Sequence, residues 1–337
     1  MKRVWFNHWF SAVYNIIALM REGCAEELYV IGTNKNETAV YKSVCDEWHR
    51  EPEGCTDAEY VDFCLDFCKK HSVDVFAPRR GLSAIMLSRD RFAAIGVRLF
   101  SDADSGMIAT LDDKIAAYRF FSERGLDCIP DMRLAHSLEE FSQAYHELSS
   151  GNRRVCYKLS VDEGARSFRV IDGRTKQKQA LLEKPGFKID YPDAVTVLSQ
   201  YDFSIPVIVM PYLDGPEISV DCLRTKSGDL IIPRFKTAGR YSVVRFDEAV
   251  MQLCGRMLDA IEITTPVNIQ FRMHEGRMWL LEINPRMSGG MQLSCAAAGI
   301  NLPAIAINQV LGYDTPWAYP AQDGRKVAHV ERAITFD

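Results

Sequence analysis

Gln270, Glu282 and Asn284 carry side-chain oxygens whose spacing could let them hold one metal ion. Apolar and polar residues alternate on both sides of Gly276, which predicts two antiparallel strands joined by a short turn. With the turn centred on Gly276, Gln270 lies opposite Glu282, and Asn284 shares the face of Glu282. Carboxylate and amide oxygens are hard donors that suit magnesium held partly by substrate phosphates, rather than zinc. The alternative is an edge hairpin whose polar face is only solvated.

This segment resembles the end of the ATP-grasp fold, the superfamily of carbamoyl-phosphate synthetase, biotin carboxylase and D-alanine ligase. In that superfamily an acidic or amide residue on one strand and Glu-x-Asn on the next hold magnesium on the ATP phosphates, and Pro-Arg follows directly. The matching residues here are Gln270, Glu282, Asn284, Pro285 and Arg286. The resemblance implies that ATP and Mg²⁺ are the cofactors, with Mn²⁺ as the alternative ion.

Two lysines match further positions of the superfamily. Lys158 ends a predicted strand, and a loop of small residues that contains Gly164 follows it. The resemblance implies that Lys158 binds the α- or β-phosphate and that the loop is a flap over the phosphates. It gives Lys114, in an Asp-Lys pair before a predicted helix, a phosphate-binding role as well. Two ammonium groups would offset part of the charge of a triphosphate. The sequence departs from the family at Leu159, where proline is frequent, and in having one glycine in the flap.

A strand-like run that ends near residue 213 matches the hinge of the superfamily, whose backbone groups bind the adenine edge. The matching residues are Met210, Pro211, Tyr212 and Leu213. The resemblance also implies that Glu217 binds the ribose hydroxyls, since a carboxylate is a good acceptor for two neighbouring hydroxyl groups. The alternative is a buried strand that ends in a turn at 214–215, with Glu217 solvated.

Several cations lie near these motifs. Arg234, Lys236 and Arg240 follow or end a predicted strand, and Arg286 follows the metal motif. In the superfamily such cations hold the acceptor carboxylate and stabilise charge on the transferring phosphoryl group. The resemblance therefore implies catalytic roles for Arg286, Arg234 and Lys236. For Arg240 an ordinary basic loop is the alternative.

The elements that must position these residues fall into two regions. Predicted strands at 3–6, 28–32, 73–77 and 97–100 alternate with predicted helices at 14–21, 58–70 and 83–95, which indicates a parallel sheet with helices on both faces. This Rossmann-like region has no glycine after its first strand, so dinucleotide binding is not expected there.

The second region predicts helices and strands of a mixed, α+β kind. The strands are expected at 155–159, 168–171, 207–212, 218–224 and 230–235. The resemblance implies an N-terminal Rossmann-like domain at 1–106 and an ATP-grasp domain at 107–337. The latter would divide into a small lobe at about 125–212 and a large lobe at about 213–337.

Composition narrows the class of protein. At 337 residues and 47% hydrophobic content the chain can bury a large core in two or three lobes. A net charge of -5 without a basic run argues against a nucleic-acid partner. Ten cysteines without a Cys-x-x-Cys pair suit a reducing cytosol, and Cys64 and Cys68 are expected to face a core. No segment resembles a membrane span or signal sequence, which predicts a cytoplasmic protein without a membrane partner.

The resemblance implies an ADP-forming carbon–nitrogen ligase. ATP would phosphorylate a small-molecule or peptide carboxylate, and an amine would attack the acyl phosphate and release phosphate. Positioning and charge stabilisation would supply most of the catalysis. The alternatives are another ATP-grasp chemistry, carboxylation or carbamoyl transfer, and a nucleotide-binding regulatory protein without turnover. A homodimer is left open.

Overall fold

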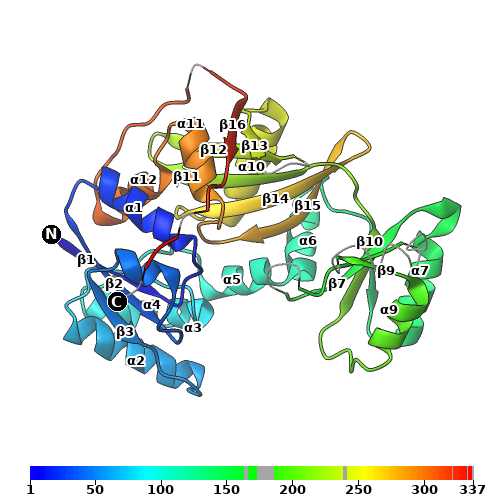
Figure 1. The fold of residues 1–337 in the computed structure, drawn as a ribbon, viewed down its shortest axis with the longest axis horizontal. Coiled ribbons are helices and arrows are strands. Elements are labelled where there is room, and N and C mark those ends of the chain that lie inside the picture. Colours follow the sequence, from blue (N-terminus) through cyan, green and yellow to red (C-terminus); the bar gives the residue numbers. More distant parts are fainter. Residues whose placement is uncertain (163–165, 173–185, 238–240, 321, 332, 336–337) are drawn as a thin grey trace. The chain divides into compact units, whose positions relative to one another are not determined.

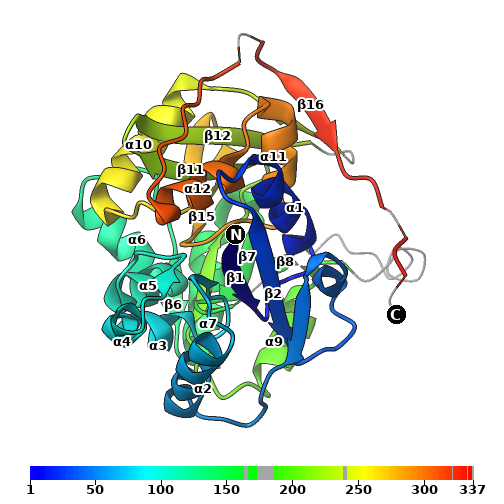
Figure 2. The ribbon, with the colours of Figure 1, turned by 90° about the vertical axis from the view of Figure 1, so that its left-hand side faces the viewer.

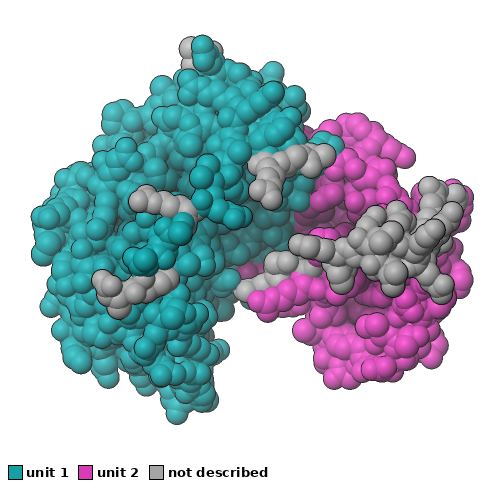
Figure 3. Space-filling model, viewed as in Figure 1, with its two compact units in different colours: residues 1–111, 216–271, 282–337 teal, residues 112–215, 272–281 magenta. Residues whose placement is uncertain are grey.

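The computed structural model describes all 337 residues except 163–165, 173–185, 238–240, 321, 332 and 336–337. The chain divides into two compact units (Figure 3). Unit 1 comprises residues 1–111, 216–271 and 282–337, and unit 2 comprises residues 112–215 and 272–281. Each unit is therefore assembled from separated stretches of the chain. The domain boundaries suggested by the sequence, 1–106 and 107–337, stay predictions.

The N-terminal part of unit 1 is a five-stranded parallel sheet, as the alternating pattern predicts (Figure 1). Its strands are, in spatial order, β3 (Glu47–Arg50), β2 (Leu28–Asn34), β1 (Lys2–Asn7), β4 (Val75–Ala77) and β5 (Arg98–Leu99). Its helices are α1 (Val13–Gly23), the 3₁₀ helix η1 (Val40–Val44), α2 (Asp57–Lys70), α3 (Leu82–Leu87) and α4 (Arg89–Ala94). The strand order reverses direction at β1. The carboxyl end of β1 therefore lies at a switch point, which is where open α/β sheets bind ligands.

Two expectations for this region need correction. The helix predicted at 83–95 is two short helices, because Ser88 has φ of -102° and ψ of 14° and so interrupts the helical backbone. The strand β3 has no counterpart among the predicted strands. Its sequence, Glu-Trp-His-Arg, is short and mostly polar and therefore shows little hydrophobic alternation.

The two faces of this sheet pack against different partners. On one face Trp5 stacks on Phe76 with ring centroids 4.0 Å apart, and both are buried with α2. On the other face α1 packs with α11 (Met291–Ala298) and α12 (Leu302–Leu311) in one core (Figure 2). Asn301 donates from Nδ2 to the carbonyl of Leu19 at 2.7 Å. The first and last thirds of the chain thus share a core within unit 1.

A six-stranded sheet forms the rest of unit 1. In spatial order its strands are β15 (Arg277–Asn284), β14 (Val267–His274), β11 (Glu217–Thr225), β12 (Gly228–Lys236), β13 (Tyr241–Val244) and β16 (Arg325–Ala328). The end of β14 and the start of β15, residues 272–281, are counted with unit 2. Two further helices are α5 (Ser105–Asp112) and α10 (Glu248–Ile261). Asp247 caps α10 by accepting from the Val250 backbone N–H at 3.2 Å.

Unit 2 is built on a five-stranded mixed sheet. In spatial order its strands are β6 (Arg133–Ala135), β10 (Val207–Pro211), β7 (Val155–Leu159), β8 (Arg169–Ile171) and β9 (Lys188–Ile189). Its helices are α6 (Lys114–Glu123), α7 (Leu138–Leu148), the 3₁₀ helix η2 (Ser150–Asn152) and α9 (Tyr191–Leu198). Phe141 of α7 packs on Val155 and Val207 in the core of this unit. The predicted mixed α/β class is confirmed.

In the described part of the chain no single helix has the length and apolarity needed to cross a membrane. The pair α11 and α12 meets those criteria only when joined, across a bend of 103°.

Candidate active site

One face of the six-stranded sheet carries a set of polar side chains. Glu217, Ser219 and Asp221 alternate along β11 and therefore share a face. Ser219 is directly opposite Arg234 on β12, so Arg234 and Lys236 lie on the same face. Lys236 forms an ion pair with Glu217. The predicted ribose ligand and one predicted catalytic cation are thus in direct contact.

A buried hydrogen-bond network lies on this face. Asp221 is fully buried and accepts from Ser294 Oγ at 2.6 Å and from Asn268 Nδ2 at 3.0 Å. Asn268, also fully buried, accepts on Oδ1 from Gln270 Nε2 at 3.0 Å. The network therefore extends from α11 through β11 and β14 to Gln270, the predicted metal ligand. It fixes the orientation of the Gln270 carboxamide.

Arg234 belongs to the same network and is only 4% exposed. Its Nε donates to Ser294 Oγ and its Nη2 donates to Ser219 Oγ, both at 3.2 Å. A Cβ added at Gly290 would lie 2.3 Å from Arg234 Nη2. The guanidinium therefore rests against the backbone just before α11, and any larger residue at position 290 would force it to shift.

Glu282, Asn284 and Arg286 form a second chain of contacts at the end of β15. Asn284 donates from Nδ2 to Glu282 Oε1 at 3.3 Å, and Arg286 donates from Nη2 to Asn284 Oδ1 at 3.1 Å. Arg286 Nη1 also donates to the carbonyl of Met287 at 3.3 Å. The structure thus brings two predicted metal ligands and one predicted catalytic cation together.

The turn before β15 differs from the expected one. It contains two residues, Glu275 and Gly276, both with positive φ, rather than one centred on Gly276. Uninterrupted pairing from this turn would place Leu281 opposite Gln270. Leu280 and Ile283 are both buried although three residues apart, a pattern expected where a strand holds one extra residue. One extra residue in β15 would place the Gln270 and Glu282 side chains on the same face of the sheet. The pairing of Gln270 with Glu282 stays a prediction.

The loop after β1 approaches the Arg286 segment. The Phe10 ring lies 5.6 Å from the Arg286 guanidinium carbon, and its Cε2 is 3.9 Å from the position of a Cβ at Gly289. His8, at the switch point of the parallel sheet, has φ of 45° and a buried Nδ1 with no hydrogen-bond partner among the described residues. Burial lowers the pKa of His8, although nearby Glu51 opposes the shift. A neutral imidazole with an unsatisfied nitrogen therefore lies on this loop.

The two predicted phosphate-binding lysines both lie in unit 2 and contact different segments. Lys114 is 7% exposed and donates from Nζ to the carbonyl of Asp162 at 3.1 Å. Lys158 is the penultimate residue of β7, and its Nζ donates to the Leu281 carbonyl at 3.4 Å. The Asp162 carboxylate accepts from both the backbone N–H and the hydroxyl of Ser167 at 2.7 Å. Gly164 of the predicted flap lies outside the described residues, as does Arg240 of unit 1.

The predicted hinge coincides with the end of β10. Met210 and Pro211 belong to that strand, and Met210 and Leu213 are buried. The backbone N–H of Tyr212 donates to the carbonyl of Arg154 at 2.8 Å. One backbone donor of the segment predicted to bind adenine is therefore already engaged.

Sequence reasoning missed Asp221, Asn268 and Ser294 as members of the site. The available signal was that Asp221 and Asn268 each lie between two apolar residues of a strand, where a buried polar side chain must find a partner.

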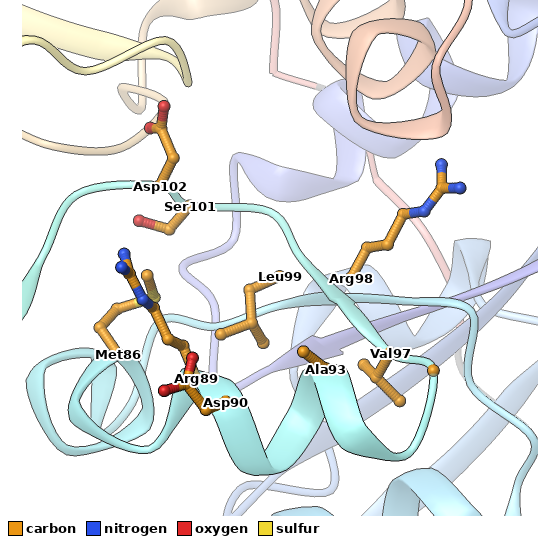
Figure 4. A pocket seen from close by; sticks show the side chains of 10 residues that line it. Met86, Arg89, Asp90, Ala93, Val97, Arg98, Leu99, Ser101 and Asp102 are labelled. Atoms are coloured by element: carbon orange, nitrogen blue, oxygen red, sulfur yellow. The ribbon is translucent and has the colours of Figure 1, made fainter.

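An open pocket of about 510 Å³ in unit 1 lies elsewhere, between α4 and the segment that contains β5 (Figure 4). Arg89, Leu99 and Ser101 are among the residues that line it. The Ser101 hydroxyl is buried without a hydrogen-bond partner among the described residues. None of the lining residues is a predicted site residue.

Comparisons with known proteins identify relatives of this chain. The family "ATP-grasp in the biosynthetic pathway with Ter operon" matches residues 204–333. The arginine-specific large chain of carbamoyl phosphate synthase from Geobacillus stearothermophilus is 24% identical over 319 residues, which is 90% of this chain and 28% of that protein. This chain thus spans less than a third of that curated relative.

Solved structures share the fold. N5-carboxyaminoimidazole ribonucleotide synthetase in its ADP complex gives a TM-score of 0.69 at 13% identity over 96% of this chain and 78% of the other. L-amino acid ligase from Bacillus licheniformis gives a TM-score of 0.63 at 13% identity over 92% of this chain and 74% of the other.

Proposed function

This chain belongs to the ATP-grasp superfamily, and on that premise we propose that it is an ATP- and Mg²⁺-dependent ligase that joins a carboxylate to an amine. A carboxylate oxygen of the substrate takes the γ-phosphoryl group of ATP, and ADP leaves. The nitrogen of the amine then attacks the acyl carbon, and phosphate leaves. The substrates are small molecules or peptides.

The single observation that carries this proposal is the contact chain Glu282–Asn284–Arg286. It places a planar guanidinium beside two oxygen-bearing side chains, with Arg286 Nη2 3.1 Å from Asn284 Oδ1. Such a guanidinium can hold phosphoryl or carboxylate oxygens with two parallel hydrogen bonds. Catalysis of phosphoryl transfer depends mainly on positioning and on charge stabilisation of this kind.

Glu282 and Asn284 also fit a magnesium ion by their donor set. Both are half-buried, and a carboxylate with an amide oxygen supplies the hard ligands that magnesium prefers while it keeps water and phosphate oxygens. When bound, magnesium would neutralise part of the triphosphate charge. Gln270 is proposed as the third ligand, with its orientation set by the bond to Asn268 at 3.0 Å.

Other residues support nucleotide binding. Lys114 and Lys158 both lie in unit 2, where their ammonium groups contact the carbonyls of Asp162 and Leu281, and we assign both to the phosphates of ATP. Glu217 is assigned to the ribose hydroxyls. A carboxylate has about four acceptor sites, so Glu217 can bind a hydroxyl without releasing Lys236. The backbone around Met210–Leu213 is assigned to adenine.

The acceptor carboxylate is assigned to the region of Arg286 and the loop at His8–Phe10. Phe10 lies against Arg286 and Gly289, and His8 presents a buried nitrogen without a partner among the described residues. This loop follows β1 at the switch point of a parallel sheet, where ligands of open α/β folds bind.

The proposal is tested by incubating the full chain with ATP, MgCl₂ and pooled carboxylates and amines, and by measuring the nucleotide products. We expect ADP and phosphate, with ATP consumption that depends on a carboxylate. Hydroxylamine should trap a hydroxamate, because it competes with the amine for the acyl phosphate. AMP and pyrophosphate as products would overturn the proposal, and turnover with bicarbonate alone would assign carboxyphosphate chemistry instead.

Arg286→Lys provides the matched variant. An ammonium cannot reproduce the two-point grip of a guanidinium, so we expect the kcat to fall at least about tenfold. Arg91→Lys, at an exposed ion pair with Asp62, is the control and should turn over at the parent rate. Equal rates in both variants would exclude a catalytic role for Arg286.

A further inference from the structure

We propose that Glu47, His49 and His71 form a binding site for a divalent transition-metal ion such as zinc. This site lies in the parallel-sheet part of unit 1 and is independent of the proposed ligase activity. It is also distinct from the predicted magnesium ligands.

The three side chains converge from two elements. Glu47 and His49 are two residues apart on β3 and therefore point to one face, and His71 directly follows α2 as its C-cap. Glu47 Oε1 lies 2.7 Å from His49 Nε2 and 2.6 Å from His71 Nδ1. The three ligand atoms all lie within 4.8 Å of one another. Two imidazoles and a carboxylate thus meet at a single point.

Neighbouring groups hold these side chains in place. Arg3 donates from Nη2 to Glu47 Oε2 at 2.8 Å and from Nε to the carbonyl of His71 at 2.6 Å. The His71 ring stacks on Phe67 with centroids 4.2 Å apart, and Phe67 is buried. Hydrogen bonds from outside the coordination sphere orient the ligands of metal sites in the same way. The ligands are therefore already oriented before an ion binds.

The donor set favours zinc or a similar ion over magnesium. Two imidazoles and a carboxylate leave one open position in a tetrahedral site, the arrangement of several zinc proteins. Zinc bonds of roughly 2.0–2.1 Å set ligand atoms about 3.3 Å apart, so the distance from each nitrogen to Glu47 Oε1 must grow by about 0.6–0.7 Å. The site is reachable from solvent, because the exposed side-chain fractions of His49, Glu47 and His71 are 36%, 23% and 10%.

Charge sets the expected affinity. The Arg3 guanidinium that orients Glu47 also repels a cation, whereas the carboxylate attracts it. We therefore expect a dissociation constant in the micromolar range rather than the nanomolar range of fully dedicated sites. Binding should persist in millimolar MgCl₂, because magnesium competes poorly for imidazole nitrogen.

The first experiment uses the chelator-treated full chain. Calorimetric titration with ZnSO₄ in the presence of excess MgCl₂ should give one zinc ion per chain. X-ray absorption of that sample should show only nitrogen and oxygen neighbours at about 2.0–2.1 Å. Sulfur neighbours at about 2.3 Å would place the zinc on cysteines, and either that result or an absence of binding would overturn the proposal.

Variants test the ligands one by one. His49→Ala with His71→Ala should weaken zinc binding at least about thirtyfold, and Glu47→Gln should weaken it at least about tenfold. His146→Ala, on α7 of unit 2, is the control and should bind zinc as the parent does. Circular dichroism checks that each variant is folded. If a variant is not folded, the X-ray absorption spectrum of the parent protein decides whether zinc binds at this site. Parental affinity in the double variant would refute the site.

Discussion

Asp221 and Arg234 are joined through one hydroxyl group, that of Ser294. Ser294 Oγ donates to Asp221 Oδ2 at 2.6 Å and accepts from Arg234 Nε at 3.2 Å. Both charged residues are buried on the sheet face that carries Gln270 and Glu217. This network connects the predicted metal ligand Gln270 to the start of α11, so its integrity should decide both the stability and the geometry of the site.

Asp221→Asn tests the network with almost no change in shape. The variant removes the charge that compensates buried Arg234 and one acceptor of a charged hydrogen bond, which should lower the free energy of unfolding by about 1.5–3 kcal/mol. Urea denaturation followed by circular dichroism measures this change. Asp66→Asn, at an exposed position on α2, is the control and should stay within about 0.5 kcal/mol of the parent. A loss below about 0.5 kcal/mol for Asp221→Asn would contradict the account.

Gly290→Ala tests the close approach of Arg234 to the backbone. Because the added Cβ would lie 2.3 Å from Arg234 Nη2, the guanidinium must shift, and we expect a loss of about 1–3 kcal/mol of unfolding free energy. Gly255→Ala on α10 is the matched control. No heavy atom lies within 4 Å of its new Cβ, so it should be stabilised by roughly 0.5–1 kcal/mol. Equal effects in the two variants would show that Arg234 is not packed there.

Thiol labelling tests the burial of the cysteines. Burial raises the pKa of Cys68, Cys156 and Cys295 to about 12, so only about one thiol in 10⁴ is ionised at pH 8. Cys55 is half-buried and contacts Arg80 Nη2 at 3.2 Å. Iodoacetamide at pH 8 should therefore modify Cys55 at least about a hundredfold faster, as measured by peptide mass spectrometry. Comparable rates at Cys68 would mean that the core opens readily.

Sequence patterns predicted much of the scaffold because hydrophobic alternation is local. The expected strands at 155–159 and 207–212 match β7 and β10 closely, and the core-facing positions of Cys64 and Cys68 are confirmed. Glu282 and Asn284 share a face, as predicted, because they are two residues apart on β15, and Arg286 just after the strand contacts Asn284.

Other parts of the site could not be derived in this way. The bond between Asp221 and Ser294 joins residues 73 positions apart, and only tertiary packing brings them together. Whether Gln270 and Glu282 lie on the same face of the sheet depends on the length of the turn between β14 and β15. One residue more or less would move every side chain that follows the turn to the opposite face. The homodimer and the cytoplasmic location stay predictions.

Magnesium-dependent nucleotide binding tests the central claim most directly. The full chain is titrated calorimetrically with a non-hydrolysable ATP analogue, with and without MgCl₂, and compared with Glu282→Gln and with the exposed control Glu248→Gln. Loss of the Glu282 carboxylate removes a proposed magnesium ligand without creating a core cavity, so the fold should be retained. We expect magnesium to strengthen binding in the parent and in Glu248→Gln, and this gain to fall at least about tenfold in Glu282→Gln. An undiminished magnesium effect in Glu282→Gln, or no nucleotide binding by the parent, would contradict the account.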